Sequence, residues 1–156
     1  MLYDERDMDV WAKTLYGEAR GEPDSGKEAV AFVILNRAKM ASHAGLLLGR
    51  AGAIAAVCLE PWQFSCWNAS DPNRALLLSA SPSKVAAERA IVDRVVSGHI
   101  VDPTNGADHY HTIDAPSWAS SWPPDWALDN PPNGATAMKE VANFGGHVFY
   151  NSRLPR

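Results

Sequence analysis

The sequence has few cysteines, no long apolar run and no surplus of basic charge. Cys58 and Cys66 are too few for a disulfide scaffold or a CxxC zinc site. We expect both thiols to be reduced in the cytosol, although an oxidising compartment would permit a bridge between them. No apolar run approaches the roughly 20 residues that span a bilayer, so we expect no membrane insertion. The net charge of −4 argues against a nucleic-acid partner, since such proteins usually carry a basic face.

Several common signatures are also missing. The N-terminus, "MLYDERDMDV", is acidic where a secretory signal would be basic and then apolar. We therefore expect a protein that is made in the cytoplasm and stays there until something else releases it. G-x-S-x-G, GxxxxGK[ST], GxGxxG and HExxH do not occur. Serine-nucleophile, phosphate-binding, dinucleotide-binding and metalloprotease chemistry thus lack support.

The chain has 156 residues, 46% of them apolar, which suits one domain over residues 1–156, and we expect a monomer. Four segments have apolar residues at helical spacing. They are residues 9–19, 26–40, 49–58 and 84–97. Ser25 precedes Glu28 by three residues, a capping-box spacing. Ser83 is a candidate N-cap of the last helix, and Gly98 a candidate C′ stop.

The C-terminal third has a different pattern. Residues 108–113 and 146–151 are rich in aromatic and β-branched side chains, which predicts two strands paired as a small antiparallel ribbon. Between them, residues 114–134 form a long loop rich in proline and tryptophan, and such loops are often functional. Residues 59–73 are predicted to be irregular. The predicted fold class is mainly α with a small antiparallel β element (α+β).

Two glutamates stand out in "TLYGEARGE", at Glu18 and Glu22. At i and i+4 of a helix they would share one face. The C-terminal end of a helix and apolar neighbours both favour a protonated carboxyl, which a general acid needs. The alternative is a pair of solvated helix-end charges, one of them paired with Arg20. Gly17 and Gly21 disfavour a helix, and we expect them to allow a tight turn between two helices.

The histidines permit a metal site as an alternative. His109 and His111 would lie on the same side of a strand, and His147 opens its partner strand. Three imidazoles, or two with a carboxylate such as Glu18 or Asp108, could hold a catalytic zinc ion. Histidines that line a sugar-binding cleft or bind a loop explain the pattern equally well.

Six tryptophans are many for this length. Those in predicted loops include four near serine and proline residues: Trp62, Trp67, Trp118 and Trp122. An indole in a loop either anchors the loop to the core or offers a flat surface on which a sugar ring can stack. The sequence alone leaves both interpretations open for each of them.

Five blocks together resemble the SleB/CwlJ-type cell wall hydrolases. In chain order they are "TLYGEARGE", "GKEAVAFVILNRA", "VCLEPWQFSCWN", "DHYHT" and "GGHVFYN". The resemblance implies a domain like that of lysozyme and the lytic transglycosylases. It also implies cleavage of the bond between N-acetylmuramic acid and N-acetylglucosamine in peptidoglycan, with a 1,6-anhydro product. Glu18 would be the single catalytic acid and base, and Glu22 would be structural.

The resemblance also implies the substrate contacts. The segment from Trp62 to Ser65 would line the site opposite Glu18, and residues 109–111 would position the sugar. The predicted substrate-binding residues are Trp62, Gln63, Phe64, His109, Tyr110, His111, Trp118 and His147. Asn36 and Arg37 would be structural, with the Asn36 amide tying down a loop. We expect no metal or cofactor.

Three other functions remain open. One is a hydrolytic muramidase or glucosaminidase that pairs Glu18 with a second carboxyl such as Asp114. Another is a zinc-dependent N-acetylmuramoyl-L-alanine amidase that uses His109, His111 and His147. The third is a glycan-binding module without catalysis. Because the chain shows neither a signal peptide nor a wall-binding domain, we expect a phage endolysin, held in the cytoplasm of the infected cell and released onto the wall.

Overall fold

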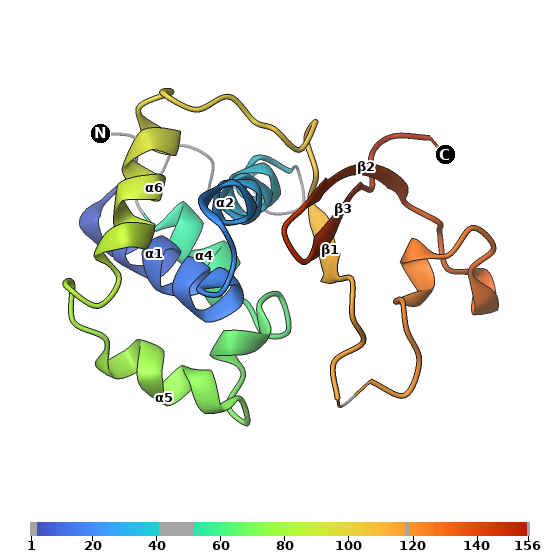
Figure 1. The fold of residues 1–156 in the computed structure, drawn as a ribbon, viewed down its shortest axis with the longest axis horizontal. Helices are drawn as coiled ribbons and strands as arrows, with labels where there is room; N and C mark the ends of the chain where they lie inside the picture. Colours follow the sequence, from blue (N-terminus) through green and yellow to red (C-terminus); the bar gives the residue numbers. More distant parts are fainter. Residues whose placement is uncertain (1–2, 41–51, 118, 156) are drawn as a thin grey trace.

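The computed structural model describes residues 3–40, 52–117 and 119–155. The helices gather on one side of the molecule and the strands on the other (Figure 1). The helices are α1 (Glu5–Ala19), α2 (Asp24–Lys39), α4 (Ala53–Leu59), α5 (Pro72–Ser79) and α6 (Ala86–Val96). The strands are β1 (His109–Thr112), β2 (Lys139–Phe144) and β3 (His147–Asn151). This architecture confirms the predicted fold class.

The helical core is built around α1, which packs against α2, α4 and α6. Trp11 and Leu15 of α1 are completely buried there. Most of α2 is buried too, from Ala29 to Ala38. A helix that is covered on nearly every side has to be apolar all round, which explains its continuous apolar sequence.

The helix ends differ from the predicted ones in several places. Helix α1 begins four residues early, because Asp4 and Asp7 form a reciprocal capping box. The capping box predicted at Ser25 is wrong, since α2 begins after Pro23 and has no side-chain cap. The short helix is confirmed as α4, although residues 49–51 of its predicted range lie outside the described residues.

The last long helix, α6, is shorter than predicted. Its N-cap is Val85 rather than Ser83. Gly98 is confirmed as the C′ residue, with a φ of +74° that suits a glycine.

One helix and one strand were not predicted. Helix α5 follows Asp71, whose side chain accepts from Asn73 N–H, and starts with Pro72. Only Leu77 of this helix is buried, so its apolar period is weak. Strand β2 carries a bulge between Glu140 and Ala142, which breaks its alternation.

The sheet order is β1-β3-β2, and both pairs are antiparallel. The predicted pairing of residues 108–113 with 146–151 is confirmed, with Tyr110 opposite Phe149 and Thr112 opposite His147. Because side chains alternate along a strand, Tyr110, His147 and Phe149 share the face that packs on the helices.

The other face of the sheet is covered by the long loop. It contains the short helical turns η2 (Asp125–Ala127) and η3 (Pro132–Gly134). Trp126 of this loop lies against His109, His111 and Tyr150, with ring centroids 5.2–5.8 Å apart. This aromatic cluster anchors the loop to the sheet. Within the described ranges, no helix is both long enough and apolar enough to cross a membrane.

Candidate active site

Glu18 lies in the last turn of α1, half-buried, where α1 meets the sheet and the turn η1 (Ser65–Trp67). Its Oε1 accepts hydrogen bonds from Cys66 N–H at 3.0 Å and from the Ser65 hydroxyl at 3.5 Å. Its Oε2 accepts one from the Tyr110 hydroxyl at 2.9 Å. Two separate segments of the chain, η1 and β1, thus fix the orientation of this carboxyl group.

Gly17 explains how η1 comes so close to α1. A Cβ atom on Gly17 would lie only 2.7 Å from Cys66 Cβ and 2.8 Å from Cys66 Sγ. The predicted role of Gly17 in a turn is therefore wrong, because it lies inside the helix and makes room for Cys66. Gly21 does lie between α1 and α2, and a Cβ there would meet nothing within 4 Å.

Tyr110 is a firm hydrogen-bond donor to Glu18. Burial raises the pKa of its phenol well above the ordinary value, and the neighbouring Glu18 carboxylate raises it further. The hydroxyl therefore stays protonated at any physiological pH. Its ring packs against Phe149 at 5.8 Å and edge-on against His147 at 5.1 Å.

Arg37 lies in the core and joins the two walls of the site, which are the segment before β1 and the segment before η1. Its Nε donates to Asp108 O at 2.6 Å, and its Nη1 donates to Gln63 O at 2.9 Å. The guanidinium lies 4.7 Å from the ring centre of Phe64. Asn36, beside it, donates to Ala107 O and to Asp102, each at 2.9 Å. The structural roles predicted for Asn36 and Arg37 are confirmed.

Trp62 is the most exposed aromatic residue near the site. Its side chain is 82% exposed, and it lies three residues before Ser65, a partner of Glu18. Its φ of +69° is unusual for a bulky residue, and such strained backbones cluster at functional sites. The backbone N–H donates to Asn68 Oδ1 at 3.4 Å.

Arg20 and Glu22 do not pair with each other. Arg20 donates to Asn73 of α5 at 2.9 Å and lies over the ring of Tyr16. Glu22 instead accepts from Gly146 N–H at 2.8 Å, in the turn between β2 and β3. The predicted ion pair between Arg20 and one of the glutamates is therefore wrong.

Other predicted substrate contacts lie elsewhere. Phe64, His111 and His147 are all less than 9% exposed, so little of their surface is open to a sugar, and their predicted role stays a prediction. His109 lies on the far face of the sheet, where its Nδ1 is 2.9 Å from Asp108 Oδ1. Trp118 lies outside the described residues.

The three histidines of the zinc alternative are split between two faces of the sheet. His109 and His111 lie on the loop-covered face, and His147 lies on the helix-facing one. Across the part of the chain that the structure describes, no three histidine, cysteine or acidic side chains are grouped to hold a metal ion. Those histidines therefore give no support to a zinc site.

Both cysteines are free and buried, and the bridge that the sequence left open is not formed. Burial raises the pKa of Cys58 to about 12. The pKa of Cys66 is also raised, by burial and then by the charge of Glu18. Both side chains stay as neutral thiols at neutral pH, so neither is an activated nucleophile.

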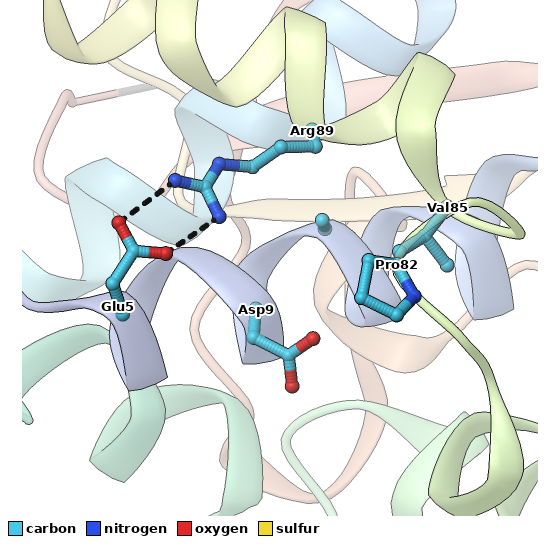
Figure 2. A pocket seen from close by; sticks show the side chains of 6 residues that line it. Glu5, Asp9, Pro82, Val85 and Arg89 are labelled. Atoms are coloured by element: carbon cyan, nitrogen blue, oxygen red, sulfur yellow. Dashed lines mark hydrogen bonds and ion pairs between the residues drawn. The ribbon is translucent and has the colours of Figure 1, made fainter.

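A cavity of about 300 Å³ lies between α1 and α6, away from Glu18 (Figure 2). Its lining consists of Glu5, Asp9, Ala12, Pro82, Val85 and Arg89. Glu5 and Arg89 form a bidentate ion pair at this cavity, with two hydrogen bonds of 3.1 Å each. None of the predicted site residues lines this cavity.

Comparison with known sequences gives a consistent result. Residues 21–150 match a family model described as Cell Wall Hydrolase. A spore cortex-lytic enzyme of Oceanobacillus iheyensis is 54% identical over 147 residues, 94% of this chain and 42% of the relative. One from Bacillus cereus is 34% identical over 94% of this chain and 45% of the relative. The chain thus spans less than half the length of these curated relatives.

Solved structures agree. The crystal structure of the catalytic domain of the Bacillus cereus SleB protein matches with a TM-score of 0.67 and 27% identity, over 96% of this chain and 92% of that one. The catalytic domain of the germination-specific lytic transglycosylase SleB from Bacillus anthracis matches with a TM-score of 0.66 and 27% identity, over 96% and 97%. The predicted likeness to a lytic-transglycosylase domain is confirmed.

These relatives correct one prediction. They are spore cortex-lytic enzymes of Bacillus-type bacteria, so the expected localisation, a phage lysin in the cytoplasm of an infected cell, is wrong. The resemblance seen in the sequence blocks is confirmed by the family match and by both structures. The chain belongs to the cell wall hydrolase family and is similar to the SleB-type enzymes.

Proposed function

We propose that this chain cleaves the glycan strands of peptidoglycan between N-acetylmuramic acid and N-acetylglucosamine, as a lytic transglycosylase. The observation that supports this most is the half-buried Glu18, held by Ser65, Cys66 and Tyr110, near the exposed indole of Trp62. The relatives, which are spore cortex-lytic enzymes and a lytic transglycosylase, support the same substrate class.

In the first step, Glu18 donates a proton to the glycosidic oxygen, and the bond from that oxygen to C1 of the muramyl residue breaks. The Cys66 N–H is part of the backbone and cannot turn away, so Glu18 Oε1 stays an acceptor. The acid proton therefore belongs on Oε2, where the Tyr110 hydroxyl can rotate to make room for it. The muramyl N-acetyl group helps to stabilise the developing positive charge.

In the second step, the C6 hydroxyl of the same muramyl residue attacks C1. The new C6–O–C1 bond closes the 1,6-anhydro ring, and Glu18, now a carboxylate, takes the hydroxyl proton. One group thus acts first as acid and then as base, and no water is added. Tyr110 and Cys66 hold the carboxylate between the two steps, when it carries its full charge.

Substrate contacts are proposed for those members of the predicted set that lie close to Glu18 or its partners and are not fully buried. Trp62 offers an indole that is free to stack on a sugar ring, and Gln63 follows it with its side chain half-buried. Tyr110 borders Glu18 directly. Trp118 remains a candidate on the basis of the sequence alone.

The hydrolytic alternative needs a second carboxyl, 5–9.5 Å from the first in ordinary glycosidases. Asp114 lies beyond the end of β1 with an exposed side chain, and Glu22 is already bound to the β2–β3 turn. We therefore propose the single-carboxyl mechanism, and the chemistry of the new sugar ends decides between it and the two-carboxyl alternative.

Mass spectrometry of the soluble products from purified spore cortex peptidoglycan tests the proposal, with the wild type, Glu18→Gln and Glu28→Gln in parallel. Glu28 is a matched control because it lies on α2 in an exposed ion pair with Arg94. We expect 1,6-anhydro-muramic ends from the wild type and from Glu28→Gln. Glu18→Gln should lower the rate by at least about a thousandfold, since the single acid and base is lost.

The other outcomes separate the alternatives. Reducing-end muramic acid, lost in Glu18→Gln, would mean hydrolysis and would call for a second carboxyl. Free peptides released equally by all three proteins would overturn the glycosidase proposal in favour of an amidase. Binding to cortex without any soluble product would leave a glycan-binding module.

A further inference from the structure

The proposed function leaves the second glutamate of "GEARGE" without a role. We propose that Glu22 is a positioning residue for Glu18, which acts through the β2–β3 turn, His147 and Tyr110. This inference rests on Glu18 being the catalytic acid, as proposed above. It assigns to Glu22 the task of holding the sheet at the place where Tyr110 can reach Glu18.

The Glu22 carboxylate packs closely against Gly145 and Gly146 of the β2–β3 turn, and we call this contact the seat of Glu22. Its Oε2 accepts from Gly146 N–H at 2.8 Å. A Cβ atom on Gly145 would lie 1.9 Å from that same oxygen, and one on Gly146 would lie 3.0 Å from Oε1. Gly145 also has a φ of +56°, which favours glycine. A side chain at Gly145 would displace this carboxylate from the turn, and one at Gly146 would crowd it.

The same carboxylate faces a buried histidine. His147 Nδ1 lies 3.7 Å from Glu22 Oε1, longer than a hydrogen bond, and has no hydrogen-bond partner among the described residues. Burial lowers the pKa of His147, and the charges of Glu22 and Glu18 only partly oppose this. The ring is therefore mostly neutral at neutral pH, and it serves as a packed element with its polar edge toward Glu22.

His147 in turn packs against Tyr110. The two rings meet edge-on, 84° apart in plane, with centroids 5.1 Å apart. They lie on neighbouring strands, since His147 is opposite Thr112, two residues after Tyr110. The Tyr110 hydroxyl then reaches Glu18 Oε2 at 2.9 Å. A continuous set of contacts therefore leads from Glu22 to Glu18 through the sheet.

This arrangement explains the spacing of the two glutamates. Glu18 lies in the last turn of α1 and Glu22 lies in the connection to α2, so one short segment carries both. One reacts, and the other fixes the strands that supply the hydroxyl donor for the first. A shift of the β2–β3 turn by about 1 Å would lengthen the bond from Tyr110 to Glu18 beyond useful range.

A double-mutant cycle tests this, with kcat and KM measured on solubilised cortex glycan from the yield of anhydro ends. The variants are Glu22→Gln, Tyr110→Phe, their combination, and Glu28→Gln as a control. Gln keeps the size and an acceptor for Gly146 N–H but loses the charge. We expect Glu22→Gln to lower kcat about threefold to tenfold with KM unchanged, since a charge-assisted hydrogen bond becomes a neutral one.

The decisive result is the combination. If Glu22 acts through Tyr110, Glu22→Gln will lower kcat no further once Tyr110→Phe has removed the hydroxyl. Losses that multiply would overturn the proposal, and so would a kcat for Glu22→Gln equal to that of Glu28→Gln. A rise in KM alone would also overturn it, because it would mean a direct contact with substrate.

Folding is checked separately. Urea midpoints accompany each variant, and Gly145→Ala, which pushes a methyl into the Glu22 carboxylate, provides a second perturbation of the seat. We expect Gly145→Ala to show the same loss of kcat and the same lack of effect in the Tyr110→Phe background. If both seat variants lose cooperative unfolding, Glu22 is a folding residue and the proposal fails.

The outcomes also separate this inference from the proposed function. If activity survives in Glu18→Gln, Glu18 is not the catalytic acid. The proposed function and the role of Glu22 then both fail. Activity lost in Glu18→Gln but kept in Glu22→Gln would sink only the role of Glu22. A readout without activity is the NMR signal of the Tyr110 ring, which should shift in Glu22→Gln and stay in place in Glu28→Gln.

Discussion

At the scale of single residues, Trp62 combines an exposed side chain with a strained backbone. Its indole is 82% exposed, so it contributes little to the core, and its φ of +69° opposes folding. A left-handed conformation is unfavourable by about 1–2 kcal/mol for a residue with a Cβ atom. A residue that is both strained and exposed, beside the partners of Glu18, is best explained by contact with substrate.

We expect Trp62→Gly to separate stability from binding. Glycine removes the strain, so the free energy of unfolding should stay the same or rise by about 1 kcal/mol. The loss of a stacking surface should raise KM by about tenfold, as expected for an apolar group that substrate covers. Urea unfolding and initial rates on cortex glycan measure the two effects.

Trp62→Phe is the matched control, because it keeps the strained Cβ and much of the ring. Its unfolding free energy should match the wild type, and its KM should lie between the two. A clear loss of stability in Trp62→Gly would contradict the argument, since it would show that the indole anchors the loop.

The sequence predicted Glu18 but only part of its surroundings. The carboxyl belongs to the first of the five blocks that together carry the family resemblance. One of its donors, Cys66 N–H, is a backbone group and leaves no trace in a sequence. The roles of His109, His111 and His147 depended on the strand register, because neighbouring residues along a strand face opposite sides.

At the scale of elements, the approach of η1 to α1 depends on a glycine inside a helix. Alanine normally stabilises a helix by about 0.5–1 kcal/mol over glycine. At Gly17, however, the new Cβ would lie 2.7–2.8 Å from the side chain of Cys66, which is too close for any real contact. Overpacking of this kind is unfavourable by about 1–3 kcal/mol, so the steric effect exceeds the helical gain.

We therefore expect Gly17→Ala to lower the free energy of unfolding by about 1 kcal/mol and kcat by at least about tenfold. The activity falls because η1 must move and take Cys66 N–H away from Glu18. Thermal unfolding and the rate of anhydro-end formation measure both effects.

Gly21→Ala is a close control four residues away. A Cβ there meets nothing within 4 Å, and its φ lies outside the left-handed region. We expect unchanged activity and a stability change within about 1 kcal/mol. Equal damage from both substitutions would show that flexibility, rather than room for Cys66, is the reason for these glycines.

The long helices were predictable, while the short elements were not. Helix α1 shows a clear apolar period over 15 residues, and α2 is recognisable as a long, strongly apolar segment within its 16 residues. Helix α5 has only eight residues and one buried side chain, although Asp71 and Pro72 are typical start signals. Strand β2 has a bulge and few buried residues, so it lacks the alternation that predicts a strand.

At the scale of the whole molecule, the helical part and the sheet meet through a few polar contacts near the site. Arg37 is central among them, because one guanidinium binds the backbone on both sides. It donates to Asp108 O before β1 and to Gln63 O in the segment that leads to η1. All three hydrogen-bond donors of Glu18 lie on these two segments, so Arg37 links the two sides of the site.

We expect Arg37→Lys to weaken stability and activity together. A lysine offers a point charge, whereas the planar guanidinium binds two carbonyls at once and stacks on Phe64. One buried carbonyl would lose its donor, which is unfavourable by about 1–3 kcal/mol, and the loss of stacking adds up to about 1–2 kcal/mol. Urea denaturation should show a loss of about 2–4 kcal/mol with an unchanged m-value.

Arg94→Lys serves as the control for this substitution. Arg94 lies on α6 in an ion pair with Glu28, and its side chain is 45% exposed. Exposed pairs contribute about 0–1 kcal/mol, so Arg94→Lys should leave stability and kcat nearly unchanged. If Arg37→Lys lowers stability yet keeps the wild-type kcat, the relative position of the two walls does not depend on Arg37. If it lowers both, the geometry around Glu18 depends on a residue that touches neither Glu18 nor the sugar.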